Sequence, residues 1–96
     1  MATSIIRNNK HMPPVETNGT DWKESNNING VRFYYYENKD TTEFDLPSRF
    51  CFVMVMNYTG NRGAAIAIDW RGDQKGVYVN RKHDSWIGWF RLQVAT

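Results

Sequence analysis

The sequence holds little cysteine, histidine or proline and contains no long hydrophobic run. Among its 96 residues are one cysteine, two histidines and three prolines. Cys51 alone excludes an internal disulfide and a cysteine-based zinc site, so we interpret it as a small buried hydrophobe within an apolar run. That run, residues 50–56, is far shorter than the ~18 residues that a membrane span requires. The first residues lack the apolar region of a signal peptide, which predicts synthesis in a cytoplasm and no membrane insertion.

The charge balance and the scattered reactive groups disfavour several classes of function. Twelve basic and ten acidic residues give a net charge of +2, and the basic residues are dispersed, so no nucleic-acid partner is expected. His11 and His83 lie far apart, and neither has a neighbour at metal-ligand spacing, so no metal site is expected. No glycine-rich loop has phosphate-binding spacing. Most carboxylates fall in predicted loops. We therefore predict a protein that is not an enzyme and that uses no cofactor.

Polarity divides the chain into two parts. Residues 1–25 are predicted to form an extended polar arm or linker, because Pro13-Pro14 is incompatible with a helix interior or a central strand. Residues 26–96 are predicted to form one β-rich module. A chain of this length supports a single core.

Short alternating segments separated by Gly, Asn and Asp turns predict an all-β fold, either a small antiparallel meander or a sandwich. No segment shows an apolar stripe at helical spacing with caps. Residues 50–56 are apolar at every position, which predicts a central strand covered on both faces. The expected strands are 31–36, 50–56, 64–70, 77–81 and 86–94.

Aromatic residues are plentiful, at 15% of the chain. The run from Phe33 to Tyr36 must point alternately to both faces of a sheet. One face can be core, and the other then needs a second layer, a neighbouring subunit or a ligand to cover it. Trp86 and Trp89 would lie on opposite faces of a regular strand, unless a bulge at Gly88 redirects one of them.

The C-terminal half resembles the terminal module of bacteriophage tail fibres and receptor-binding domains of the pyocin-knob type. The segment 76–81 ends a tyrosine-containing strand with an arginine. The segment 84–92 then follows with a polar turn, Trp86, Trp89, an aromatic residue, a basic residue and a leucine. The earlier segment 29–34 is similar to the opening of that module, an asparagine followed by an aromatic strand. The resemblance covers roughly residues 26–94.

This resemblance implies a virion component, assembled in the host cytoplasm, that binds without catalysing a reaction. It implies a homotrimer that recognises a polysaccharide or protein receptor on a bacterial surface, and whose arm joins other virion proteins. Fewer than thirty residues precede the module, whereas tail fibres carry long shafts, so the position within the virion stays open. The alternative is a structural decoration or connector protein of the virion that binds no receptor.

Aromatic rings beside Asn, Asp, Arg and Gln suit sugar binding, because rings stack on the C–H edges of a pyranose and planar polar groups bond its hydroxyls. Turns and strand ends carry the contacts in β modules. Arg71-Gly72-Asp73 matches the integrin-recognition tripeptide, and we interpret it as an ordinary turn. The predicted receptor contacts are Tyr58, Trp70, Arg71, Asp73, Tyr78, Asn80 and Arg81.

Overall fold

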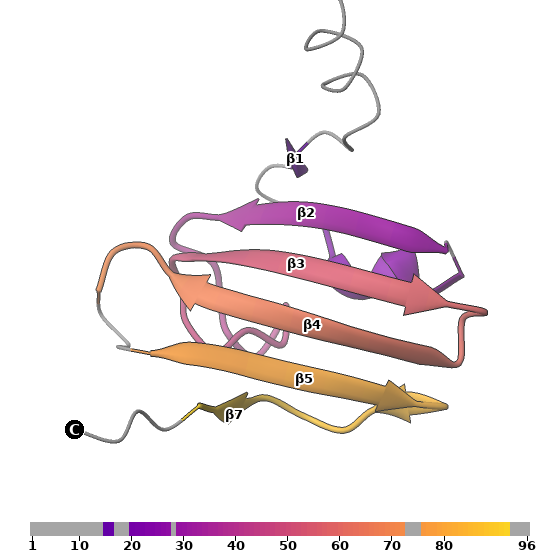
Figure 1. Ribbon diagram of the computed structural model, residues 1–96. Helices are drawn as coiled ribbons and strands as arrows, with labels where there is room; N and C mark the ends of the chain where they lie inside the picture. Colours follow the sequence, from indigo (N-terminus) through magenta and orange to yellow (C-terminus); the bar gives the residue numbers. More distant parts are fainter. Residues whose placement is uncertain (1–14, 17–19, 28, 73–75, 93–96) are drawn as a thin grey trace, which may run out of the picture.

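A single sheet with a cover on one side makes up the fold (Figure 1). The computed structural model describes residues 15–16, 20–27, 29–72 and 76–92. Their elements in chain order are β1 (Val15–Glu16), a 3-10 helix η1 (Trp22–Asn27), β2 (Gly30–Tyr36), β3 (Cys51–Tyr58), β4 (Arg62–Asp69), β5 (Val77–His83), β6 (Ser85–Trp86) and β7 (Phe90–Arg91).

The strands lie in the order β1-β2-β3-β4-β5-β6, and β7 also pairs with β5. Strands β2 to β5 form an antiparallel meander (Figure 1), whereas β1 runs parallel to β2. The described residues contain no α-helix, and none of their helices is long and apolar enough to span a membrane. The prediction of an all-β antiparallel fold is therefore confirmed. The four expected strands between residues 31 and 81 each match one strand, with small changes at their ends.

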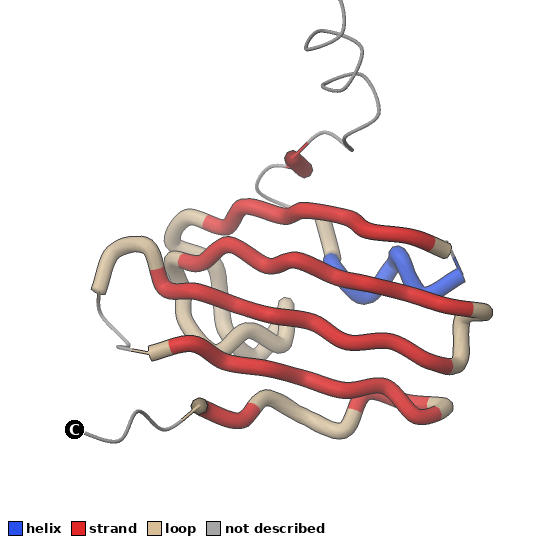
Figure 2. The backbone as a smooth tube through the Cα atoms, viewed as in Figure 1, coloured by secondary structure: helices blue, strands red, loops and turns tan. Residues whose placement is uncertain are grey.

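The core lies between one face of the sheet, called the inner face here, and a cover made by η1 and the segment 37–50 (Figure 2). Trp22 is fully buried at its centre, and its ring centroid lies 4.9 Å from that of Trp86 and 5.2 Å from that of Trp89. The indole N–H groups of Trp22 and Trp89 both donate to the carbonyl of Asp45, at 3.1 and 2.6 Å. These bonds satisfy two buried donors, as a core of this kind requires.

Trp22 also fixes the entry of the chain into the module. Its backbone N–H donates to the hydroxyl of Tyr36 at 2.9 Å, and that hydroxyl donates to the carbonyl of Thr20 at 2.5 Å. Both Thr20 and Trp22 belong to the predicted arm, residues 1–25. The boundary at residue 26 therefore needs correction, because the folded module includes Trp22. Residues 1–14 and 17–19 of the predicted arm lie outside the described residues.

The expected strand over residues 86–94 is interrupted, which corrects that prediction. Gly88 has φ of +129°, a conformation that L-residues with side chains rarely adopt, and it separates β6 from β7. The break redirects the chain, so Trp86 and Trp89 both contact Trp22. The sequence predicts these two tryptophans on opposite faces unless the chain is redirected at Gly88, and the structure shows such a redirection. The predicted end of this strand, at residue 94, lies outside the described residues.

Removal of the Trp22 ring is expected to cost about 3–5 kcal/mol of unfolding free energy, the usual loss for a large buried aromatic. A domain of this size has a total of roughly 5–14 kcal/mol, so Trp22→Ala should lower the urea midpoint steeply. Trp22→Phe keeps much of the ring contact and should lose less than half as much. Equal urea midpoints for the wild type and Trp22→Ala would contradict the central position of this ring.

The buried thiol of Cys51 is expected to make the fold sensitive to alkaline pH. Burial raises the pKa of Cys51 to about 12, from 9.0 in the unfolded chain. Because the unfolded thiol ionises first, the unfolding free energy falls as pH rises from about 9 towards 12, by at most about 1.4 kcal/mol per pH unit. Between pH 9 and 10, thermal unfolding should show this slope in the wild type and a flatter slope in Cys51→Ala. Equal slopes in the wild type and Cys51→Ala would show that Cys51 does not cause the alkaline loss of stability.

Candidate functional site: an aromatic corner beside an apolar sheet face

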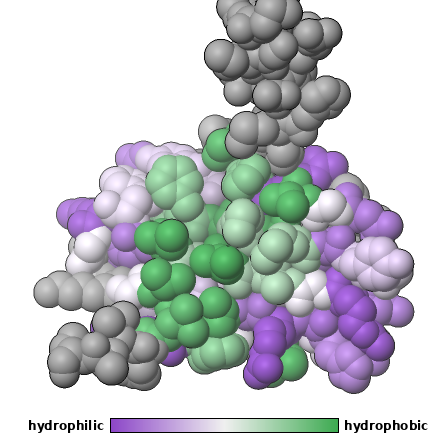
Figure 3. Space-filling model, viewed as in Figure 1, coloured by the Kyte–Doolittle hydropathy of each residue, from purple (hydrophilic) through white to green (hydrophobic). Residues whose placement is uncertain are grey.

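The side of the sheet opposite the core, called the outer face, is apolar and has no covering layer among the described residues (Figure 3). The register assigns its side chains, since residues paired across neighbouring strands share a face. In Figure 3 the green residues form a belt across the strands. The apolar members of the outer face are Val15, Val31, Phe33, Phe52, Met54, Met56, Ala64, Ile66, Ile68, Val77, Val79 and Phe90. The register places Tyr35, Tyr58, Arg62, Arg81 and His83 on the same side of the sheet, towards its ends and margin.

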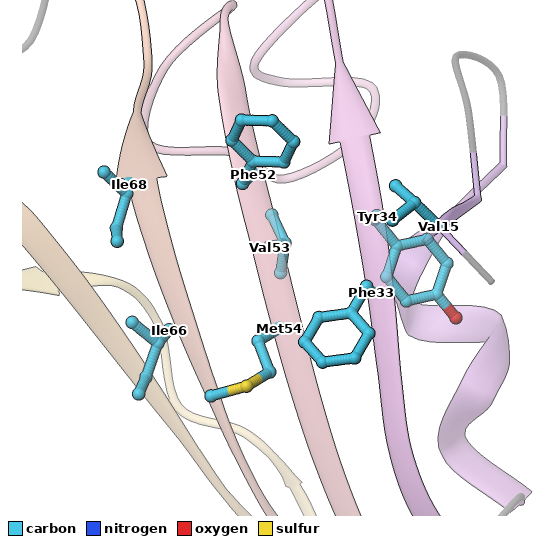
Figure 4. A pocket seen from close by; sticks show the side chains of 8 residues that line it. All are labelled: Val15, Phe33, Tyr34, Phe52, Val53, Met54, Ile66 and Ile68. Atoms are coloured by element: carbon cyan, nitrogen blue, oxygen red, sulfur yellow. The ribbon is translucent and has the colours of Figure 1, made fainter. Parts of the chain in front are cut away.

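An open depression of about 330 Å³ lies in the outer face, over β2, β3 and β4. Side chains from these strands and from β1 surround it, including Val15, Phe33, Phe52, Met54 and Ile68 (Figure 4). Val15 reaches the rim because β1 pairs with β2 at Phe33. A lining of this kind provides apolar contact and no reactive group.

Aromatic rings and two charged groups meet at one end of the outer face. The ring of Trp70 stacks on Tyr35 with centroids 5.6 Å apart, and contacts Phe50 edge-on at 5.5 Å. The guanidinium of Arg71 lies over the ring of Phe50, 4.5 Å from its centroid. On the other side, the hydroxyl of Tyr35 donates to Glu37 at 2.7 Å. We call these five residues the aromatic corner.

A turn after β4 sets the position of Trp70 and Arg71. One carboxylate oxygen of Asp69 accepts the N–H groups of Arg71 and Gly72, at 2.7 and 2.5 Å. Its other oxygen accepts the hydroxyl of Ser48 at 2.7 Å, which joins the turn to the covering segment. The indole of Trp70 donates to the carbonyl of Tyr36 at 3.0 Å. The corner is therefore anchored at both sides by hydrogen bonds.

Hydrogen bonding keeps the phenol of the corner in its protonated form. The bond to Glu37 raises the pKa of Tyr35, and the negative charge of that carboxylate acts in the same direction. Tyr35 therefore remains a neutral hydroxyl throughout the physiological range.

Among the described residues, no three His, Cys, Asp or Glu side chains are grouped as metal ligands would be.

The structure brings together two of the seven predicted contacts, Trp70 and Arg71. Tyr58 is 70% exposed but lies at the opposite end of β3, where it pairs with Arg62. At about 3.4 Å per residue, roughly 20–25 Å separates it from the corner. Arg81 lies at the margin of the outer face, with its guanidinium 5.3 Å from the ring centroid of Phe90. Asp73 lies outside the described residues.

The other two predicted contacts, Tyr78 and Asn80, point to the inner face. Tyr78 is half-buried against the core, and Asn80 is fully buried, with its side-chain oxygen accepting the N–H of Gly88 at 2.9 Å. Asn80 is thus corrected from a surface contact to a packing residue. The alternation of β5 decides this, since Val77 and Val79 take the outer face.

Sequence reasoning missed Tyr35, Glu37 and Phe50 of the corner, and it missed the extent of the outer face. The sequence did indicate an apolar outer face. In residues 50–56 and 33–36 both the odd and the even positions are apolar or aromatic, and these positions point to opposite faces of a strand. We expected residues 50–56 to be covered on both faces. Within the described part of the chain only the inner side of β3 is covered, and Phe52 is 47% exposed.

Comparison of the chain with protein-family models, curated proteins and solved structures found no match. The resemblance to phage fibre modules therefore stays a prediction from the sequence.

The carboxylate of Asp69 is expected to hold the corner in place. Asp69→Ala removes the acceptor of two N–H groups and one hydroxyl, and hydrogen bonds to a charged acceptor contribute about 1.5–3 kcal/mol each before partial replacement by water. We expect a net loss of about 2–3 kcal/mol in chemical denaturation, together with increased quenching of Trp70 fluorescence by acrylamide. Asp69→Asn should have an unfolding free energy between those of the wild type and Asp69→Ala. Unchanged quenching in Asp69→Ala would show that the turn does not position Trp70.

Proposed function

We propose that this chain is a non-enzymatic receptor-binding module that recognises a glycan on a bacterial surface through the aromatic corner. The observation that carries the proposal is the stacked pair Tyr35 and Trp70, with the Arg71 guanidinium and the Glu37 carboxylate at its two sides. Trp70 retains 38% of its surface exposed to solvent. A partly exposed ring between charged groups matches the amphipathic surface of a sugar.

Each group of the corner supplies one kind of contact that a sugar needs. The ring of Trp70 offers an apolar face to the C–H edge of a pyranose. Arg71 carries several N–H donors in a planar fork, and Glu37 carries acceptor oxygens. Contacts to charged groups are about twice as strong as neutral hydrogen bonds. The corner thus combines stacking with donors and acceptors for hydroxyl groups.

The resemblance of residues 76–92 to phage fibre modules supports a place for this chain in a virion fibre or tip. In such a particle the receptor sites occur in several copies, for which the resemblance implies three. Weak sites on one particle act together, and avidity raises the overall affinity by ~10²–10⁴-fold without new contacts. Attachment to other virion proteins is proposed through the N-terminal part of the chain.

The alternative function is that of a structural virion connector that binds no receptor. The exposed apolar outer face favours it, since such a face suits a protein partner better than a sugar. Adherence to bacteria separates the two functions, because the connector is expected not to bind cells. The variants that follow test the corner itself.

Trp70→Ala should reduce binding at least about 10-fold, equivalent to ~1.4 kcal/mol of lost stacking. The measurement is adsorption of fluorescently labelled protein to a panel of intact bacteria and to surface polysaccharides purified from them. Glu37→Gln and Arg71→Ala should weaken binding as well, while Ile87→Ala, at a 64% exposed position outside the corner, should not. Circular dichroism confirms that each variant is folded.

Either of two adsorption results would refute the proposed binding site. One is adsorption that is unchanged in folded Trp70→Ala and Arg71→Ala. The other is loss of adsorption in Tyr58→Ala alone, which would move the receptor site to the far end of the sheet. Release of oligosaccharide from the polysaccharides would indicate an enzyme and overturn the non-enzymatic function.

A further inference from the structure

The three central rows of the outer face present an almost uncharged surface across six strands. In its central row the register aligns Val15, Phe33, Met54, Ile66, Val79 and Phe90. In this row and the two rows beside it, among the described residues, Arg81 is the one charged side chain, and its guanidinium lies against Phe90 at the margin. A face of this composition offers nothing to pair with a nucleic acid or a charged peptide. Its occupant must be apolar.

The area of the outer face is large for the surface of a monomer. Phe52, Ile68 and Phe90 remain 47%, 49% and 42% exposed. With roughly 150–250 Å² for a large exposed side chain, the face and its rim expose on the order of 800 Å². The largest apolar patch of a typical monomer covers ~300–600 Å², whereas each partner of a standard interface buries ~800 Å². The outer face therefore matches one half of a stable protein interface.

A second copy of this chain matches the composition of the outer face better than the polar N-terminal segment does. Residues 1–14 contain four large apolar side chains, Met1, Ile5, Ile6 and Met12, whereas the outer face has twelve apolar residues. Another copy of the same chain brings an equal area of equal composition. Two sheets that stack face to face lie ~10 Å apart with interdigitated side chains, and branched aliphatic and aromatic residues are typical of such a seam.

We propose that the outer face is the surface through which copies of this chain associate. The pairing is isologous for two copies, with the same patch on both sides of the seam. With three copies, the three faces enclose one shared core. In both arrangements the aromatic corner lies at the edge of the buried area, and the inner face and its tryptophan cluster take no part in assembly. The proposal is independent of the glycan-binding function.

Ile68→Arg tests this surface in the row next to its central row. Ile68 pairs with Phe52 on one side and Val77 on the other, and it is exposed in the single chain, so the substitution is compatible with the fold. In an assembly it buries a guanidinium from every copy, which should weaken association on the order of 100-fold or more. Thr42→Arg is the control, because it introduces the same charge at an exposed position of the covering segment 37–50, away from the outer face.

The full chain and both variants are compared by size-exclusion chromatography with light scattering over a range of concentrations. The wild type and Thr42→Arg should give twice or three times the 11.3 kDa of one chain, and Ile68→Arg should give 11.3 kDa with an unchanged circular dichroism spectrum. Peroxide should oxidise Met54 more slowly in the assembled wild type than in folded Ile68→Arg. This second readout separates loss of the seam from loss of folding.

A wild type that is monomeric at all concentrations would overturn the proposal. This holds even if the outer face then proves to bind a different protein. An assembly that Ile68→Arg leaves intact would overturn it as well. Failure of this proposal is distinguishable from failure of the proposed function. Binding of a soluble oligosaccharide to monomeric Ile68→Arg tests only whether the aromatic corner binds sugar. The molecular mass tests only whether copies of the chain associate through the outer face.

Discussion

Trp22 anchors a single covering layer on a sheet whose strands are apolar on both sides, and the rest of the structure depends on this contact. The ring fills the space between Trp86 and Trp89 and fixes the segment 37–50 through the carbonyl of Asp45. Strand geometry sends alternate side chains to opposite faces, so each apolar residue that the cover buries has neighbours on the uncovered side. Because the described residues form one cover, on the inner side, the outer face stays exposed among them.

The cover and the aromatic corner are physically connected. Ser48 belongs to the covering segment, and its hydroxyl bonds the same carboxylate of Asp69 that orders the turn before Gly72. Trp70 in turn donates to the backbone of Tyr36, whose hydroxyl accepts the N–H of Trp22. A short path of hydrogen bonds thus leads from the centre of the core to the exposed rings. The position of the corner is therefore tied to the core.

Much of this fold could be predicted from the sequence, because the alternation of apolar residues with period two identifies strands directly. Three errors have physical causes. Trp22 stands in a polar stretch, so composition gave no sign of its role in the core. The strand after residue 85 breaks at Gly88, where backbone conformation overrides the side-chain pattern. Asn80 was placed on the surface because a strand pattern shows two faces without showing which one is covered.

The candidate site was predictable in part for the same reason. Trp70 and Arg71 follow a strand and precede a glycine, which marks a turn, and turns are exposed. Tyr35 and Glu37 are far from that turn in sequence, and only the pairing of β2 with β3 and β3 with β4 brings them to it. Long-range register of this kind cannot be read from one sequence.

The separation of the tryptophan cluster from the corner has a consequence for how such a protein changes over time. The rings that hold the fold lie on the inner side, whereas the exposed part of the corner lies beyond the end of β4. Replacements at Arg71 or Glu37 therefore leave the inner packing intact. Side chains at this end can therefore be exchanged over evolutionary time while the scaffold stays the same.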